Sequence, residues 1–441
     1  MNIRIILAIL FLSTPLFLKA EGEKEGLVAD QGIADQRITT LKNNTQIVYS
    51  GNEQRRDSLG RLLNIFYYDQ FRHFQDPRAP YFMFLSKKGD LALGVGGQVK
   101  IRGYFDWNGS IPTAGFIPYN IQIPKNPTEM NNLSASASGT GLFFTLLGNN
   151  KVLGNYMAYF QADFAGYNNR GFRIKKAYVL IKDWTAGYAT TTFEDTKAEP
   201  PTVDGSGPNG INSKTNVLVR YTYPFKKHFT VAGSVEFPSE SILADGLHTE
   251  ACNPYIPDFC AFVQYHWDNE ASHVRLSGLL RTLTYRDMVR SKNHNITGWG
   301  LQLSTVINPI SPLNIFGILS TGQGHASYTT DLGNSNFDLI PVIGQPGKLY
   351  APWAAGIVAG AQYFFSDKVF ANVAFSEQTY YPRHNPDNSY YKYGLYAVGN
   401  IFWDILPRFE VGLEYLHGKR KNFNGESGSA NRIMALLMVS F

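Results

Sequence analysis

The stretch NRIMALLMVSF, residues 431–441, decides the fold of this chain. It is apolar up to a final aromatic residue, whereas a chain end in solvent normally frays and carries polar residues. Successive side chains of a strand point to opposite faces. One face would carry Met434, Leu436, Met438 and Ser440, and the other Ile433, Ala435, Leu437, Val439 and Phe441. We therefore predict a terminal strand that is covered on both sides, with the second face toward lipid.

Sixteen strand cores follow one another from residue 91 onward. Most of them alternate apolar and polar residues, as in NVLVRYTYP and RFEVGLEYLHG, which is typical of a strand with two different faces. The cores are residues 91–106, 139–147, 154–165, 171–182, 184–193, 214–224, 228–237, 258–267, 271–286, 294–307, 312–322, 354–366, 368–381, 389–403, 406–417 and 431–441.

The connectors between these cores alternate in length. NNKVLG, KDW, FKK, DNEA, NPISP, SDK and DIL are short, and the segments between them are generally longer. The connector GYNNR at 166–170 is the exception, because it is short where a long one is expected. An outer-membrane barrel has this arrangement, with short periplasmic turns at one rim and long extracellular loops at the other.

A sheet that spans hydrocarbon cannot leave backbone N–H and C=O groups unpaired, so the last strand must pair with the first. We predict an all-β fold, a 16-stranded antiparallel transmembrane β-barrel over residues 91–441, in the outer membrane of a Gram-negative bacterium. Lipid and lipopolysaccharide would surround it. Phe441 would lie at the periplasmic interface and resembles the terminal aromatic signal that the barrel assembly machinery recognises.

The first 90 residues have a different character. Residues 1–20 combine Arg4, an apolar stretch and the small Ala20, which is the pattern of a secretory signal peptide. A membrane anchor is the alternative, but the apolar run is short for one. Residues 21–90 would form a periplasmic or pore-associated segment. One amphipathic helix is predicted at 57–74, where Leu and Phe recur at helical spacing.

Composition narrows the function classes. Beyond residue 20 no stretch approaches about 18 consecutive apolar residues, which argues against membrane helices. The 26 Tyr, 30 Phe and 41 Gly residues are typical of many strands and turns, and the net charge of +5 is too small to indicate nucleic-acid binding. No spacing of His and Cys indicates a metal, and no cofactor is predicted. Cys252 and Cys260 could form a disulfide in an exported chain or remain free thiols.

Charged residues within the strands should point into the lumen, because an Arg or Lys that faces lipid costs about 2–4 kcal/mol at mid-bilayer. The predicted pore-lining bases are Lys100, Arg102, Arg173, Lys175, Arg220, Arg275 and Arg281. The predicted pore-lining acids are Asp106, Asp163, Glu236, Glu410 and Glu414. Lys176 breaks the alternation, which a bulge, a rim position or a subunit interface would accommodate.

The bases lie mainly on neighbouring strands in the first half of the barrel, whereas the acids lie elsewhere. Such a separation sets a transverse field that favours anions at the narrowest point. The alternative is that these charges only solvate a water-filled interior. A barrel of sixteen strands conducts unless something constricts it, and loops 107–138, 194–213 and 323–353 are the candidates. The first contains apolar residues, which indicate that it folds inward or clasps a neighbouring subunit.

The segment FRIKKAYVLIKDWTAGYATTTFEDTKAEPPTVD resembles the DcaP-like trimeric porins. The matching positions are Arg173, Lys175, Ala177, Tyr178, Trp184, Gly187, Thr192, Phe193, Asp195 and Pro200, followed by Arg220, Tyr221, Thr222, Glu236 and Pro238. The resemblance implies a homotrimer that takes up small anionic organic solutes. Two departures are Lys175, where Arg is usual, and the lack of an extended heptad pattern before the barrel, which some relatives carry as a coiled coil.

These patterns predict a porin that lets small hydrophilic, anionic organic solutes diffuse passively through a basic-lined pore. One alternative is a plugged structural or assembly barrel of an outer-membrane complex. An enzyme is not predicted, because the nine His residues are scattered and no Ser/His/Asp spacing stands out. A fatty-acid type transporter would need a plugged, apolar lumen, which the charged inner faces argue against.

Overall fold

The computed structural model describes residues 46–48, 82–86, 91–167, 170–267, 271–383 and 387–441. The predicted signal peptide and the helix predicted at 57–74 lie outside these ranges. Among the residues that are described, no helix is long and apolar enough to cross a membrane.

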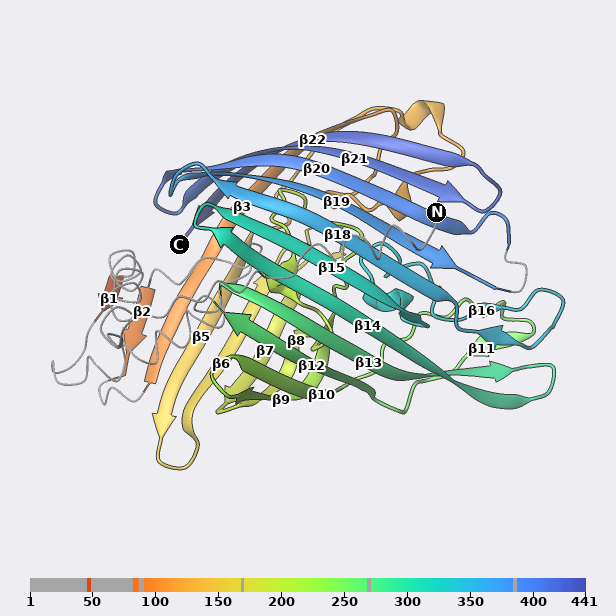
Figure 1. Cartoon of the computed structure of the whole chain (residues 1–441), viewed down its shortest axis with the longest axis horizontal. Helices are drawn as coiled ribbons and strands as arrows, with labels where there is room; N and C mark the ends of the chain where they lie inside the picture. Colours follow the sequence, from red (N-terminus) through yellow and green to blue (C-terminus); the bar gives the residue numbers. More distant parts are fainter. Residues whose placement is uncertain (1–45, 49–81, 87–90, 168–169, 268–270, 384–386) are drawn as a thin grey trace, which may run out of the picture. The chain divides into compact units, whose positions relative to one another are not determined.

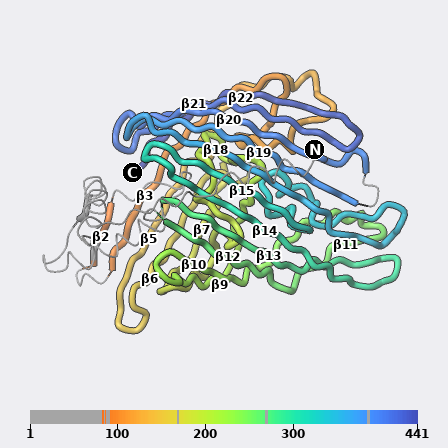
Figure 2. Tube along the Cα trace, in the orientation of Figure 1, coloured from red at the N-terminus to blue at the C-terminus, as the bar shows by residue number. Residues whose placement is uncertain are grey.

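Sixteen long strands make up the wall (Figures 1 and 2). They are β3 (Leu91–Trp107), β5 (Gly141–Asn150), β6 (Gly154–Asp163), β7 (Arg173–Ile181), β8 (Trp184–Thr190), β9 (Thr215–Phe225), β10 (Phe229–Glu236), β12 (Asp258–Trp267), β13 (Ser272–Asp287), β14 (Lys292–Ile310), β15 (Leu313–Gln323), β18 (Trp353–Phe364), β19 (Val369–Tyr381), β20 (Tyr391–Leu406), β21 (Phe409–Asn422) and β22 (Ser427–Ser440). Each overlaps one predicted core, and β12 has the predicted bounds.

The wall closes on itself. Each long strand pairs antiparallel with the next, and β22 pairs antiparallel with β3 from Asn431↔Trp107 to Ser440↔Gln98. Closure removes the sheet edges that hydrocarbon cannot tolerate. The predicted 16-stranded antiparallel barrel is therefore confirmed.

The two rims differ as predicted. The gaps β5–β6, β7–β8, β9–β10, β12–β13, β14–β15, β18–β19 and β20–β21 are two to four residues long. Most connections at the other rim are longer, and these contain β4 (Asn132–Ser136), β11 (Thr249–Ala251), β16 (Ile340–Pro341) and β17 (Leu349–Tyr350). The β13–β14 and β21–β22 connections differ from the prediction, because the strands extend further and leave gaps of only four residues each. At the short-turn rim, β2 (Phe82–Leu85) pairs with the start of β3, and β1 (Gln46–Val48) pairs parallel with β2.

The exterior is apolar. On β3, Val99, Ile101 and Phe105 are each more than 40% exposed, whereas Lys100 and Arg102 are buried. Aromatic side chains gather near both rims of the outer wall, for example Trp184 against Tyr221 at the short-turn rim and Trp107 against Tyr415 at the other. Such girdles are typical of membrane barrels, and the exterior supports the predicted outer-membrane location.

Phe441 joins the seam between the first and last strands. Its N–H donates to the Gly97 carbonyl at 2.9 Å, and its carbonyl accepts from the Gly97 N–H at 2.9 Å. Deleting Phe441 should lower the amount of folded protein in the outer membrane several-fold without changing the conductance of the molecules that assemble. Quantification of heat-modifiable barrel in outer-membrane fractions tests this. Phe441→Ala keeps the backbone bonds and separates the role of the ring, and normal levels of the deletion variant would contradict the assembly role.

Candidate functional site: the lumen and its inward loops

The pairing register assigns every strand residue to one face of the wall. Residues directly opposite in neighbouring strands share a face, so the inner face can be followed from Lys100 around the barrel and back to β3. Eleven of the twelve predicted charged positions fall on this inner face, namely Lys100, Arg102, Asp106, Asp163, Arg173, Arg220, Glu236, Arg275, Arg281, Glu410 and Glu414.

Lys175 is the twelfth, and here the structure differs from the prediction. Gln161 pairs with Lys176 while Ala162 pairs with Ile174, so Lys175 is the extra residue of a β-bulge. The bulge resets the alternation and places Lys176, instead of Lys175, in the inward row that continues from Arg173. This explains why Lys176 broke the sequence pattern.

Three segments fold into the lumen from the long-loop rim: the 108–131 loop, the 191–214 loop and the 324–352 loop. They overlap the three connectors 107–138, 194–213 and 323–353 that were predicted as constricting candidates, and the second is longer than predicted because β8 ends at Thr190. Their interior residues are almost fully buried, among them Phe116, Val203, Tyr328 and Leu339. The lumen is thus narrowed by folded chain.

Two of the predicted pore acids hold the 191–214 loop. Glu236 on β10 accepts the backbone N–H of Thr192 at 2.9 Å. Glu414 on β21, on the other side of the barrel, accepts those of Val203 at 2.6 Å and Asp204 at 2.7 Å. Charge-assisted bonds to backbone N–H groups satisfy buried carboxylates well. These acids therefore anchor a loop that crosses the lumen, and they do not face open water as pore-lining groups.

Further contacts fix the course of this loop. Asp195 lies 2.8 Å from Nε2 of His273 on β13 and accepts a hydrogen bond from Ser304 on β14. Asn212 donates to Gln302 at 2.7 Å, and the N–H of Gly210 donates to Ser376 on β19 at 2.7 Å. The loop is pinned to both halves of the wall.

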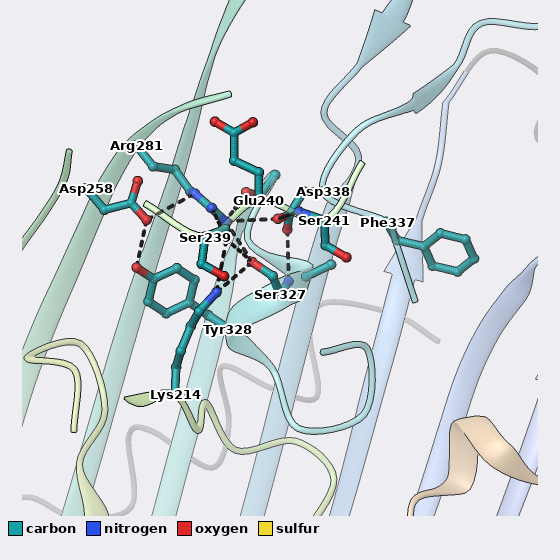
Figure 3. Close-up of polar contacts among 12 residues, drawn as sticks. Lys214, Ser239, Glu240, Ser241, Asp258, Arg281, Ser327, Tyr328, Phe337 and Asp338 are labelled. Carbon is teal, nitrogen blue, oxygen red and sulfur yellow. Dashed lines mark hydrogen bonds and ion pairs between the residues drawn. The ribbon is translucent and has the colours of Figure 1, made fainter. Parts of the chain in front are cut away.

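Arg281 forms the centre of a buried polar network that holds the 324–352 loop (Figure 3). Its guanidinium lies 3.1 Å from Asp338 of that loop and 3.5 Å from Asp258 on β12, and it donates to Ser327 at 2.9 Å. Tyr328 donates its hydroxyl to Asp258 at 2.8 Å. Arg281 is only 1% exposed, so its charge stabilises this network and is not presented to the pore.

Loop groups around this network have altered proton affinities. Burial lowers the pKa of Lys214 to about 8, with Arg281 as the next cause, and burial raises the pKa of Glu240 to about 7. Away from this network, burial also raises the pKa of Asp331, which accepts a hydrogen bond from Asn209 at 3.0 Å, to about 6. Lys214 remains largely protonated at neutral pH, so it contributes positive charge inside the barrel.

The 108–131 loop packs its apolar residues on the inner wall. The Phe116 ring lies against Gly418 of β21 so closely that a Cβ at residue 418 would be 2.4 Å from it. Ile111 and Ile121 belong to the same buried cluster, with Leu416 and Met434 of the wall. This loop was predicted either to fold inward or to clasp a neighbouring subunit, and in the structure its apolar residues fold inward.

Arg432 is a buried base that the sequence reading missed. Its guanidinium pairs with Asp106 through Nη2 and Oδ2 at 2.8 Å and donates to the Ile111 carbonyl at 2.8 Å. Asp106 therefore holds a loop-anchoring ion pair. Arg432 lies two residues before Met434, so the alternation of the last strand already places it on the inner face. Its partner Asp106 becomes evident only from the register of β22 on β3.

The remaining predicted bases differ in their exposure and in the groups that they contact. Arg173 pairs with Asp163 at 2.8 Å, although half of its side chain stays exposed. Arg275 lies 3.4 Å from Asp195 and stacks on the Phe262 ring. Arg220 donates to the Thr190 carbonyl at 3.3 Å. Arg102 lies in the field of Asp204, Glu414 and Asp163.

A polar cavity of about 310 Å³ lies between the 191–214 and 324–352 loops. Its lining residues are Gly205, Ser206, Ser213, Ser327, Thr329, Thr330, Gly333 and Asn334.

Within the described ranges, no group of three or more His, Cys, Asp or Glu side chains is arranged to hold a metal ion. Cys252 and Cys260 are free thiols and do not form the disulfide that was one of the two options.

No protein-family model matches the chain, and no curated protein matches it in sequence. Its barrel nevertheless has the architecture of outer-membrane channels. It is similar to the crystal structure of the outer membrane channel DcaP of Acinetobacter baumannii, with a TM-score of 0.70 and 21% identity over 81% of this chain and 99% of that chain. OmpT, an outer membrane protein of Vibrio cholerae, follows at a TM-score of 0.51 and 12% identity over 81% of this chain and 100% of that chain.

These likenesses show a shared fold, and the DcaP-like architecture that the sequence resemblance implied is thereby confirmed. The closed barrel and its apolar exterior agree with the predicted location in the Gram-negative outer membrane.

Proposed function

We propose that the protein is a porin that lets small hydrophilic, anionic organic solutes diffuse passively across the outer membrane. The observation that carries the proposal is the distribution of charge beside the polar cavity. Arg102 and Lys214 border it, whereas the neighbouring acids Glu236 and Glu414 are engaged by backbone donors of the 191–214 loop. A narrow passage with fixed positive groups favours anions.

Flux through liposomes tests the proposal. Vesicles that contain the purified protein should swell faster in an organic anion such as succinate than in an organic cation of similar size. Equal and slow swelling in both, at the rate of protein-free vesicles, would contradict the proposal.

Removing positive charge from the lumen should reduce anion preference. The double variant Arg102→Ala/Arg220→Ala should shift the reversal potential in a KCl gradient toward that of a cation-selective pore, because both side chains lie on the inner face. Lys226→Ala/Lys227→Ala is a matched control, since it removes the same charge from an exposed turn at the short-turn rim. An unchanged reversal potential in the lumen variant would argue against these bases as selectivity determinants.

A plugged structural barrel is the second candidate. The dense apolar packing of the 108–131 loop on the inner wall favours it. A plugged barrel would show no conductance and would be purified with a stable partner.

We also propose that the protein is a homotrimer surrounded by lipopolysaccharide. Cross-linking of the purified protein in detergent tests the trimer.

A further inference from the structure

The polar cavity has an unusual chemical composition for a space inside an aromatic-rich barrel. Of its eight lining residues, five carry a hydroxyl group, one is an asparagine and two are glycines. None of these eight described residues has an aromatic or aliphatic side chain. A solute in this open cavity therefore meets hydrogen-bonding groups wherever it touches these lining residues.

Two cationic side chains border the cavity. The Arg102 guanidinium lies against Gly205, where a Cβ would be only 3.1 Å from Nη1. Glycine at 205 thus leaves the guanidinium at the edge of the cavity. Lys214 Nζ donates to Ser327 Oγ at 3.3 Å and to the Ser239 carbonyl at 3.1 Å. Each cation adjoins a lining residue, so a carboxylate in the cavity is close to positive charge.

Backbone N–H groups between and within the two loops hold the segments that carry the hydroxyl groups. The Thr330 N–H donates to the Ile211 carbonyl at 2.9 Å, and the Ser213 N–H donates to the Tyr328 carbonyl at 2.8 Å. The N–H of Ser206 donates to Asp204 at 3.2 Å. The backbone around the cavity is therefore fixed before a solute arrives, which lowers the entropic cost of binding.

Two buried polar atoms beside the cavity lack a hydrogen-bond partner among the described residues. They are the Thr330 hydroxyl oxygen and the Arg102 Nε. Neither atom is open to solvent, so a solute hydroxyl or carboxylate reaches them only when neighbouring side chains shift. Sites built to hydrogen-bond a hydroxyl discriminate against an analogue that lacks it, because the polar groups of the site are then left unpaired.

We propose that this cavity is a solute-binding site selective for hydroxylated carboxylates, the class of hydroxy acids and sugar acids, over plain carboxylates of equal charge and length. Its volume equals that of about ten liquid-water molecules, which suits a small acid of this class. The proposal rests on the proposed anion channel and adds a preference that charge alone does not produce.

Tartrate and succinate are the probes, because both are four-carbon dianions and only tartrate carries hydroxyls. In planar bilayers with the full-length protein, tartrate should interrupt the chloride current at a concentration roughly fivefold or more below that of succinate, the factor expected for one net hydrogen bond. In Ser206→Ala/Thr330→Val this difference should vanish while the conductance in KCl is kept. Ser277→Ala is the control, since it removes an inner-face hydroxyl of β13 that does not line the cavity.

The outcomes separate the two proposals. Equal blocking by tartrate and succinate in the unaltered, anion-selective protein would overturn hydroxyl recognition and leave the porin function standing. A tartrate preference that persists in Ser206→Ala/Thr330→Val would overturn the assignment to this cavity, whatever the result for Ser277→Ala. A protein that does not conduct at all would overturn both proposals.

Discussion

Replacing residues 195–212 with a short Gly-Ser linker should raise the single-channel conductance several-fold. This segment is bonded to β13 and β14 at one side and to β19 and β21 at the other, so it crosses the lumen. Removing it opens cross-section that folded chain now fills. Single-channel recording in symmetrical KCl measures the effect.

A matched control shortens the β13–β14 hairpin at residues 288–291, whose side chains are exposed outside the lumen. That variant should conduct like the unaltered protein. Heat-modifiable electrophoretic mobility shows whether each barrel is folded. A folded variant without residues 195–212 and with unchanged conductance would mean that this loop does not set the constriction.

Arg281→Met should lower the free energy of unfolding by about 3–5 kcal/mol, because breaking a buried ion pair leaves uncompensated charge. The carboxylates left behind are Asp258 and Asp338, neither of which is exposed. Urea titration of the barrel in lipid vesicles measures the loss. Arg281→Met/Asp338→Asn should lose less than Arg281→Met alone, since one of the unpaired charges is then removed.

Arg286→Met is the control for this variant. Arg286 lies on the same strand and donates to Asn293 in an exposed position at 3.0 Å, so its removal should change stability by no more than about 0.5 kcal/mol. If Arg281→Met were as mild as Arg286→Met, the network of Figure 3 would not be what holds the 324–352 loop.

The strands of the wall and their lipid-facing sides were predictable, because apolar and polar residues alternate within each strand. The two faces can be assigned without knowing the partner strand, as the alternation of Val99, Lys100, Ile101 and Arg102 shows. The bulge at Lys175 was not predictable from alternation, because one extra residue exchanges the two faces and an isolated strand does not show where pairing is interrupted.

The roles of the lumen charges were harder to predict than their positions. An inward carboxylate looks the same in sequence whether it faces water or a backbone N–H, so Glu414 was read as a pore-lining acid although it anchors Val203 and Asp204. The loops have no periodicity that fixes their contacts. Tyr328 and Asp258 are 70 residues apart, and only the folded chain brings them together.

Single-channel recording of the unaltered protein in a KCl gradient tests the central claim most directly. We expect discrete, stable conductance steps and a reversal potential of the sign expected for an anion-preferring pore. A silent bilayer with folded protein inserted, or a reversal potential of the opposite sign, would contradict it.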